Sequence, residues 1–518
     1  MRDARSTGPG DLLDRRASGI LLHPTSLPGP NGCGDIGAPA DAFLAWLERA
    51  GQRLWQMLPI GPIGYGNSPY SAHSTFAGNT LLISLEALEK EGWLERAQPP
   101  SRLPHGRVNY AATARHRVRR LRQAFDNFRV RGHPASFEAF CAREAGWLDD
   151  FALYSALRDH QRGPPWVAWP APLRDREPAA LDEAKRSLAE TIDFHRFCQW
   201  VFDRQWADLR QRSAAHGVAL IGDLPIFLAH DSADVWANRR LFFLDERGAP
   251  TVVAGVPPDY FSRTGQRWGN PLYRWEVLER EGFSFWIERI RRALSQFDLV
   301  RLDPFIGFVR YWEIPASCET AIEGRWRPVP GRALFGAVKE QLGLERLPFI
   351  AEDLGAVSEE VFELRDALQL PGLKLLQFAF GDDPQAESFL PHNYERRSVV
   401  YTGTHDNDTL RGWWEDVGGE ASTRTREQII REKEAVRRYV PGRPSQIVWN
   451  MIRLALLSVA NPPIFPTQDS LEVGTSARMN RPGTVGGNWE WRLRTLPPER
   501  AERLASLSAT YARTGRKP

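Results

Sequence analysis

Three carboxylic acids lie at, or a few residues after, the ends of short apolar runs of the sequence. Asp303 ends the run FDLVRLD, Glu352 follows LPFIA, and Asp406 lies in SVVYTGTHDND. Two carboxylates held close together can cleave a glycosidic bond with retention of configuration, one as the nucleophile and the other as the acid/base. A third carboxylate can stabilise the positive charge that develops on the sugar. The three acids therefore indicate glycosyl chemistry by a retaining mechanism.

Arg301 lies two residues before Asp303. Side chains at i and i+2 share one face of a strand, so we expect Arg301 and Asp303 to point the same way, with Val300 and Leu302 packing behind the sheet. A guanidinium beside a carboxylate lowers the pKa of that carboxyl and keeps it ionised. A glycosyl nucleophile must be ionised. A structural Arg–Asp ion pair at the rim of the sheet is the alternative, and this motif alone leaves both interpretations open.

The sequence around Glu352 favours a general acid, while two other motifs lack the patterns of a calcium site and of a phosphate site. Three apolar residues precede Glu352, which predicts partial desolvation and the raised pKa of a general acid. Asp406 and Asp408 are spaced as at the start of an EF-hand loop, but the last ligand position falls on Val417, which excludes calcium binding of that type. GPIGYG lacks the GxGxxG order and precedes no GK[ST], which argues against phosphate binding.

Eight short apolar runs, each ending in polar residues near glycine or proline, set the fold class. They cover residues 18–29, 53–62, 217–227, 297–305, 347–355, 371–381, 398–408 and 461–471. Stretches with helical spacing separate most of them. Continuous apolar strands that alternate with helices indicate a parallel sheet buried on both faces. Eight such units predict an α/β (β/α)₈ TIM barrel, with its chemistry at the C-terminal ends of the strands. A doubly wound open sheet is the alternative.

The segment from about 83 to 215 is too long for one loop of a barrel. LLISLEALEKEGWL and VNYAATARHRVRRLRQAFDNF have helical patterns, and RGPPWVAWPAPLRDREP is a proline-rich connection. We therefore predict a mainly helical insertion after the second strand, at about 83–215. It interrupts a single catalytic barrel over 18–518, which follows a polar N-terminal segment, 1–17.

Composition narrows the range of partners and compartments. The net charge is only +3, and the arginines are spread along all 518 residues, so no nucleic-acid partner is expected. The four cysteines are far apart and form no CxxC or Cys/His cluster, which fits a reducing compartment better than disulfides or zinc. The sequence has no signal-peptide core and no apolar run of membrane-spanning length. We expect a cytoplasmic protein, without membrane association, that is a monomer or homodimer.

At the level of longer motifs, the sequence resembles the 4-α-glucanotransferases of the amylomaltase, or disproportionating enzyme, type (glycoside hydrolase family 77). The resemblance runs from about Ser18 to Arg494. The matching stretches are SGILLHPTSLPGPNGCGDIG, GYGNSPY with FAGN, GDLPIF, DSADVWA, VVAGVPPDYFSRTGQRWGNPLYRW, FIAEDLG, PGLKLLQFAFG, GTHDND and ARMNRPGTVGGNWEWR. The VAGVPPDYFS and ARMNRPGTVGGNW blocks are the most specific, whereas the short acid motifs also fit the related α-amylases.

The resemblance implies a role for each matching residue. Asp303 would be the nucleophile, Glu352 the acid/base and Asp406 the transition-state stabiliser, with Arg301 orienting Asp303. The implied glucan contacts are His405, Tyr70 and Asp223 around the cleaved linkage, Gln266 and Trp268 in a loop that covers the glucan, and Tyr65 at a secondary glucan site. The family acts on α-1,4-glucans and maltooligosaccharides and uses no metal or organic cofactor. A covering loop, with bulky tips at Tyr260 and Phe261, would keep water from the glycosyl-enzyme until an acceptor arrives.

Four positions depart from the usual family pattern. Pro304 replaces a histidine after the nucleophile and Ile306 replaces a common arginine, while Asn67 and His73 differ around GYGNSPY. A proline is tolerable at the end of a barrel strand, where its missing N–H serves no ladder. We predict a glucan disproportionating enzyme. The alternatives are a retaining α-1,4-glucan hydrolase on the same site, or a glucan-binding protein impaired through Pro304 and Ile306.

Overall fold

The computed structural model describes residues 9–100, 103–258, 262–355, 357–419, 422 and 424–515. Eight parallel strands form one sheet in the order β10-β11-β12-β1-β2-β3-β6-β9. They are β1 (Gly19–Leu21), β2 (Leu54–Gln56), β3 (Ala219–Pro225), β6 (Leu299–Asp303), β9 (Phe349–Ala351), β10 (Gly372–Leu375), β11 (Ser398–Tyr401) and β12 (Pro463–Pro466). Each strand lies within one of the predicted apolar runs, so the prediction of eight parallel strands is confirmed.

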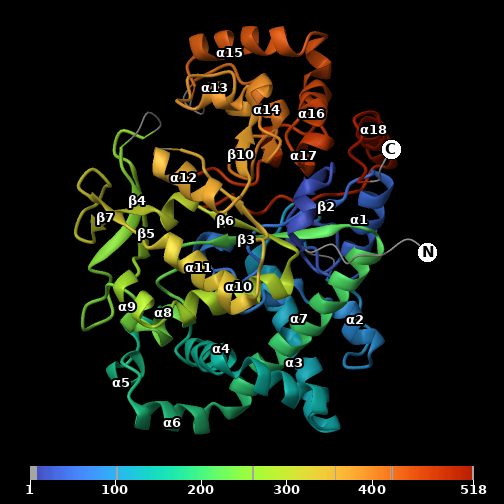
Figure 1. Cartoon of the computed structure of the whole chain (residues 1–518). Coiled ribbons are helices and arrows are strands. Elements are labelled where there is room, and N and C mark those ends of the chain that lie inside the picture. The colour runs from blue at the N-terminus through green and yellow to red at the C-terminus, as the bar shows by residue number, and fades with distance from the viewer. Residues whose placement is uncertain are drawn as a thin grey trace.

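The two ends of this sheet, β9 and β10, meet. The Ala351 N–H donates to the Pro371 carbonyl at 2.9 Å. The Asp353 carboxylate accepts a hydrogen bond from the Leu373 N–H at 2.7 Å and from Arg365 at 2.7 Å. The sheet is thereby nearly closed into a barrel, which rules out the doubly wound open sheet (Figure 1). Closure gathers the C-terminal ends of all eight strands at one mouth.

Alternate residues along the strands enter two separate cores. One cluster lies inside the barrel and includes Leu21, Leu54, Ile221, Leu299, Ile350, Leu373, Tyr401 and Ile464. Their neighbours in sequence, such as Ile20, Trp55, Leu220 and Val300, belong to the larger cluster between the sheet and the helices. Because strand side chains alternate between faces, burial on both faces requires the continuous apolar runs seen in the sequence.

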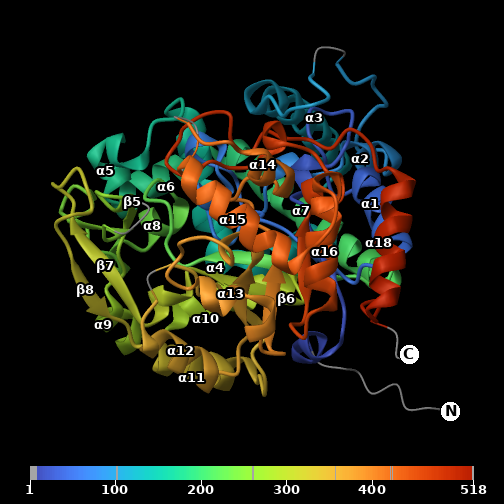
Figure 2. The same cartoon turned by 90° about the horizontal axis from the view of Figure 1, so that it is seen from above.

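Helices surround the barrel (Figures 1 and 2). They are α1 (Ala38–Arg49), α8 (Ala233–Ala237), α9 (Trp275–Arg280), α10 (Ser284–Gln296), α11 (Gly331–Leu342), α12 (Glu359–Ala367), α13 (Ala386–Phe389), α14 (Leu410–Glu415), α15 (Arg426–Tyr439), α16 (Ile447–Leu457), α17 (Thr467–Ser470) and α18 (Pro498–Thr510). Helix α18, near the end of the chain, packs beside α1, near its beginning. Among the described residues, no helix is long and apolar enough to cross a membrane.

The chain between β2 and β3 forms a layer of helices below the barrel in Figure 1. These helices are α2 (Leu85–Lys90), α3 (Tyr110–Arg131), α4 (Ala135–His160), α5 (Ala171–Arg174), α6 (Pro178–Ser187) and α7 (Ala189–Ala215). Helix α4 packs against α7, which in turn packs against β3. The mainly helical character predicted after the second strand is confirmed.

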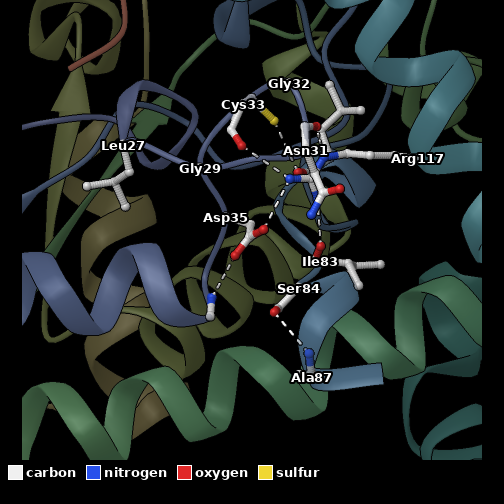
Figure 3. Close-up of polar contacts among 12 residues, drawn as sticks. Leu27, Gly29, Asn31, Gly32, Cys33, Asp35, Ile83, Ser84, Ala87 and Arg117 are labelled. Atoms are coloured by element: carbon white, nitrogen blue, oxygen red, sulfur yellow. Dashed lines mark hydrogen bonds and ion pairs between the residues drawn. The ribbon is translucent and has the colours of Figure 1, made fainter. Parts of the chain in front are cut away.

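Arg117 of α3 docks this helical layer onto the loop that follows β1 (Figure 3). The guanidinium is fully buried and donates hydrogen bonds to the carbonyls of Asn31 at 3.1 Å, Ile83 at 2.7 Å and Cys33 at 3.2 Å. It also pairs with the buried carboxylate of Asp35 at 3.1 Å. A buried cation is stable only when its donors are satisfied and its charge is paired, and Arg117 meets both conditions.

A second, antiparallel sheet lies at one side of the barrel, where β4, β5 and β7 are labelled in Figure 1. Its order is β5-β4-β7-β8, with β4 (Val252–Val256), β5 (Gln266–Pro271), β7 (Arg310–Pro315) and β8 (Arg325–Pro328). No pattern in the sequence predicted this sheet. The first four residues of the VAGVPPDYFS motif, 253–256, belong to β4, so the motif begins within this folded sheet.

Candidate active site

Charged residues replace apolar ones on the inward-facing rows of three neighbouring strands as the strands reach the mouth. The inward row of β3 continues from Ile221 to Asp223, that of β6 from Leu299 to Arg301 and Asp303, and that of β9 from Ile350 to Glu352. Because β3 pairs with β6 and β6 with β9, these charged side chains are adjacent. The period of two along each strand therefore aims them into one space.

Arg301 links two carboxylates at the centre of this group. Its Nη1 donates to Oδ2 of Asp223 at 2.7 Å and to Oδ2 of Asp303 at 2.6 Å. The side chain of Asp223 is fully buried, and its Oδ2 also accepts the hydroxyl of Tyr70 at 2.7 Å. Burial disfavours the charged guanidinium, but the carboxylates of Asp223 and Asp303 outweigh this effect and hold the pKa of Arg301 well above its ordinary value. Asp303 is therefore oriented by a permanent cation.

Glu352 is fixed beside the segment that carries Asp303. Its N–H donates to the Leu302 carbonyl at 3.1 Å, and its own carbonyl accepts the Phe305 N–H at 2.8 Å. The residue is 7% exposed. Burial, together with the nearby charge of Asp303, raises the pKa of Glu352 well above its ordinary value. This carboxyl therefore favours its protonated form, which is the state that a general acid needs.

Asp406 has a more open environment, in the loop after β11. Its side chain is 47% exposed. Oδ1 accepts a hydrogen bond from Asn480 Nδ2 at 2.6 Å, and Oδ2 lies 3.4 Å from Nε2 of His405. Asn480 was not predicted from the sequence as a site residue, although its motif, ARMNRPG, was among the most specific blocks. Glu352 is therefore buried beside Asp303, whereas the carboxylate of Asp406 is partly exposed and is held by Asn480.

Tyr70 lies among the carboxylates from these different strand ends. Burial first, and then the charges of Asp223, Asp303 and Asp406, raise the pKa of its hydroxyl well above the ordinary value. Its ring stacks on His405, with centroids 5.1 Å apart and an interplanar angle of 20°. Tyr70 and His405 therefore form one wall of the same mouth that contains the acids.

The comparisons with known proteins agree with this geometry. A family model described as 4-alpha-glucanotransferase matches residues 22–497. The chain belongs to the 4-alpha-glucanotransferase family. A 4-alpha-glucanotransferase of Thermus thermophilus is 51% identical over 511 residues, which cover 96% of this chain and 99% of the relative. A 4-alpha-glucanotransferase of Synechocystis is 45% identical over 492 residues, covering 93% of this chain and 94% of the relative.

One solved structure leads to the same family, and a second shows the same fold. An amylomaltase from Streptococcus agalactiae, in complex with acarbose, superposes with a TM-score of 0.90 at 36% identity, covering 96% of this chain and all of that one. An amylomaltase from Corynebacterium glutamicum shares the fold, with a TM-score of 0.75 at 19% identity, covering 96% of this chain and 76% of that one. The predicted family, TIM-barrel fold and 4-alpha-glucanotransferase activity are confirmed.

In this member of the 4-alpha-glucanotransferase family, Gln266 and Trp268 lie on β5 at the rim of the mouth. Trp268 is 40% exposed, its ring centroid is 6.1 Å from that of Phe227 in the loop after β3, and its indole N–H donates to Gln266 at 3.2 Å. The expected loop tips, Tyr260 and Phe261, lie outside the described residues. The structure therefore places two of the expected glucan contacts at the rim, separate from the acids.

Tyr65 is separate from the acids as well. It begins the short helix η3 (Tyr65–Asn67), and its side chain is 78% exposed. Tyr70 belongs to the next turn, η4 (Pro69–Ser71), where the Ser68 hydroxyl accepts the Tyr70 N–H at 3.2 Å. The GYGNSPY motif therefore directs one tyrosine into the mouth and the other to solvent.

The four departures from the family pattern have different surroundings. Asn67 adopts a left-handed φ of 59°, which asparagine tolerates better than most residues. Nδ1 of His73 lies 2.8 Å from the Asp231 carbonyl. Pro304 precedes the short helix η8 (Phe305–Phe308) in extended conformation, and Ile306 packs against the main core. Among these four residues, only Pro304 adjoins an acid in sequence.

Two recesses extend the mouth. One is an open recess of about 610 Å³ and is lined by Tyr70, Asp223 and Phe227 among others. The other is an open recess of about 430 Å³ and is lined by His405 and Arg478 among others. Within the described part of the chain, no group of three or more His, Cys, Asp or Glu side chains is arranged to hold a metal ion.

Proposed function

We propose that this chain disproportionates maltooligosaccharides by a retaining double displacement at Asp303, Glu352 and Asp406. It transfers α-1,4-glucan segments to the 4-OH of acceptor glucans. One observation carries the assignment of residues: Arg301 holds Asp303 at 2.6 Å, beside a buried Glu352 whose pKa is raised. An oriented carboxylate next to a protonated carboxyl is the pair that retaining glycosyl transfer requires.

In the first step, a carboxylate oxygen of Asp303 attacks the anomeric carbon of the donor. Glu352 gives its proton to the glycosidic oxygen, the bond to the leaving glucan breaks, and a covalent glycosyl-enzyme forms. In the second step, the 4-OH of an acceptor attacks the same carbon while Glu352 takes its proton. Asp303 leaves as a carboxylate, and configuration is retained because the carbon has been inverted twice.

Asp406 and Arg301 supply the electrostatic part of this mechanism. The exposed carboxylate of Asp406 faces the mouth and stabilises the positive charge of the oxocarbenium-like transition state. Arg301 orients the nucleophile. Because the side chain of Asp223 has no exposed surface and is bonded to Arg301 and Tyr70, we assign it to support of these two residues. Its other oxygen, Oδ1, has no hydrogen-bond partner among the described residues, and Asp223 lines the larger recess, so the sugar contact expected from the sequence stays a prediction.

Tyr70 and His405 form the wall against which the donor sugar binds, and Gln266 and Trp268 contact the glucan further along the rim. The partly exposed ring of Trp268 offers a face for a pyranose. The acarbose complex of the Streptococcus agalactiae amylomaltase supports a mouth that binds oligosaccharide-like ligands. Tyr65, exposed outside the mouth, is assigned to a secondary glucan site.

Incubation with maltotriose tests the proposed function. Glucose together with a ladder of longer oligosaccharides is the expected product pattern. Glucose and maltose alone would indicate the hydrolase, and unchanged maltotriose would indicate the impaired glucan-binding protein. Product anomers resolved by NMR at early times report whether configuration is retained.

We also propose a cytoplasmic location and a monomeric or homodimeric state. The cysteines Cys33, Cys141, Cys198 and Cys318 are all free, which suits a reducing compartment. Residues 18–518 are assigned to one barrel domain, with an insertion at about 83–215 and a polar segment at 1–17. Cell fractionation tests the location, light scattering tests the oligomeric state, and limited proteolysis tests the domain bounds.

A further inference from the structure

We infer that Asn480 is a positioning residue that fixes the carboxylate of Asp406, a role that rests on the proposed function of Asp406 as transition-state stabiliser. Asn480 comes from the segment after α17, and Asp406 from the loop after β11. Two bonds join them. Asn480 Nδ2 donates to Oδ1 of Asp406 at 2.6 Å, and the Asn480 backbone N–H donates to the His405 carbonyl at 3.1 Å.

Asp406 needs an external support because little else restrains its carboxylate. Its side chain is 47% exposed, and its second oxygen is 3.4 Å from His405, longer than a good hydrogen bond. An exposed carboxyl rotates freely unless a donor holds it, and freedom of this kind weakens electrostatic stabilisation of a transition state. A hydrogen bond to a charged acceptor is about twice as strong as a neutral one, so the Asn480 amide can select one orientation.

Arg478 makes Asn480 a fixed donor. Its Nε donates to the Asn480 carbonyl at 2.7 Å, and its Nη2 donates to the Asp406 carbonyl at 2.6 Å. One guanidinium thus joins the backbones of the two residues whose side chains are hydrogen-bonded to each other. The amide of Asn480 therefore keeps its position relative to the Asp406 carboxylate.

The rest of the segment is anchored to the helical layer. The Trp489 N–H donates to the Met479 carbonyl at 2.7 Å, and the Tyr110 hydroxyl donates to the Trp489 carbonyl at 2.7 Å. Arg492 extends this attachment to the loop after β1, where it donates to the Gly29 carbonyl at 2.7 Å. Asp406 is therefore held from outside its own loop, by a segment tied to α3 and β1.

Asn480→Ala tests the inference, with Asn488→Ala as the matched control. Asn488 lies in the same segment, and its side chain bonds to the backbones of Arg481 and Thr484 instead of to Asp406. For Asn480→Ala we expect kcat for maltotriose disproportionation to fall about 10- to 100-fold, with KM changed less than about threefold, because the contact acts in the transition state. Asn488→Ala is expected to keep at least half of kcat. Melting temperatures establish that both variants are folded.

Asn480→Asp gives a readout that a merely structural role would not change. This isosteric variant places a second carboxyl against Asp406. Below the raised pKa of such a pair, one shared proton restores a hydrogen bond, whereas above it the two charges repel. The kcat of Asn480→Asp relative to wild type should therefore rise as pH falls, while the same ratio for Asn480→Ala stays constant.

Three results would overturn the inference: an Asn480→Ala variant that keeps more than half of kcat, an Asn488→Ala variant with an equal loss, or an Asn480→Asp ratio that is independent of pH. Failure of the underlying assignment is measured separately with Asp406→Ala. If that variant keeps more than about a tenth of wild-type kcat, the proposed role of Asp406 is wrong whatever Asn480 does.

Discussion

Tyr70 and His405 stack with their ring centroids 5.1 Å apart and their planes inclined by 20°. One comes from the loop after β2 and the other from the loop after β11, two strands that are separated in the sheet by β12 and β1. The pair therefore joins loops from different parts of the mouth. The Tyr70 hydroxyl also donates to Asp223, which binds Arg301, and Arg301 holds Asp303, the proposed nucleophile.

This arrangement predicts different losses for two variants of Tyr70. Tyr70→Phe keeps the stacked ring and loses one hydrogen bond of ~1 kcal/mol, so kcat/KM should fall about fivefold. Tyr70→Ala also removes the wall and should lose at least ten times more. Both are measured by maltotriose disproportionation. Equal losses in the two variants would show that stacking on His405 has no role.

The three acids should each be indispensable. Asp303→Asn, Glu352→Gln and Asp406→Asn remove a charge or a proton that is used in the transition state, so each should lower turnover by several orders of magnitude in a folded protein. A variant that keeps more than about a tenth of the activity has lost only ~1.4 kcal/mol, which is too little for its assigned role. Circular dichroism melting provides the control for folding.

Glu352 should set the alkaline limit of activity. Its pKa is raised by burial and by Asp303, and the proposed acid works only while protonated, so kcat/KM should fall as pH rises through this raised value. A profile of kcat/KM against pH measures it. The Arg301→Gln variant removes the positive charge that lowers the pKa of Glu352, so it should move the alkaline limb to higher pH. A limb that does not move would be assigned to another group.

The raised pKa of Glu352 also predicts that the free energy of unfolding depends on pH. Because the folded pKa of Glu352 lies above its unfolded value, the folded state binds the proton more tightly, and this contribution to stability is lost as pH rises through the folded pKa. Glu352→Gln cannot ionise. Its free energy of unfolding should therefore increase relative to wild type as pH rises above about 4.5, the ordinary value. Denaturant unfolding at a series of pH values measures the difference.

The buried pair of Arg117 and Asp35 should matter for stability and not for chemistry. Asp35→Ala leaves a buried guanidinium without its partner, which should cost ~3–5 kcal/mol of unfolding free energy. The exposed pair of Arg129 and Glu190, at 2.8 Å, is the control, and Glu190→Ala should change stability by less than ~1 kcal/mol. Equal effects in the two variants would contradict the docking role of Arg117.

Pro304→His tests whether the departure after the nucleophile impairs the enzyme. Pro304 directly follows β6, and the family pattern has a histidine at this position, so we expect the variant to fold. We expect the activity of the variant on maltotriose to lie within about tenfold of wild type, the scale of one hydrogen bond of ~1 kcal/mol. An inert natural protein, restored about a thousandfold by histidine, would favour the impaired glucan-binding protein.

Local sequence patterns predict the strands and the positions of the acids along them. A strand buried on both faces must be continuously apolar, so each barrel strand is visible as a local run, and the polar residue that ends it is visible too. For this reason the amino-acid sequence alone predicts Asp303, Glu352 and Asp406 as candidate acids. The eight runs also predicted the barrel, because parallel strands separated by helices have few other arrangements.

Contacts between residues that are distant in the sequence could not be predicted in this way. The contact of Asn480 with Asp406 joins residues 74 positions apart, and the antiparallel sheet pairs Gly255 with Trp312. The full burial of Asp223 depends likewise on Arg301 and Tyr70, which come from two other loops and strands. Local periodicity reports the environment of a side chain, but not the identity of its partner. Partners are fixed by barrel closure and by the docking of the helical layer, which bring separate segments to the same mouth.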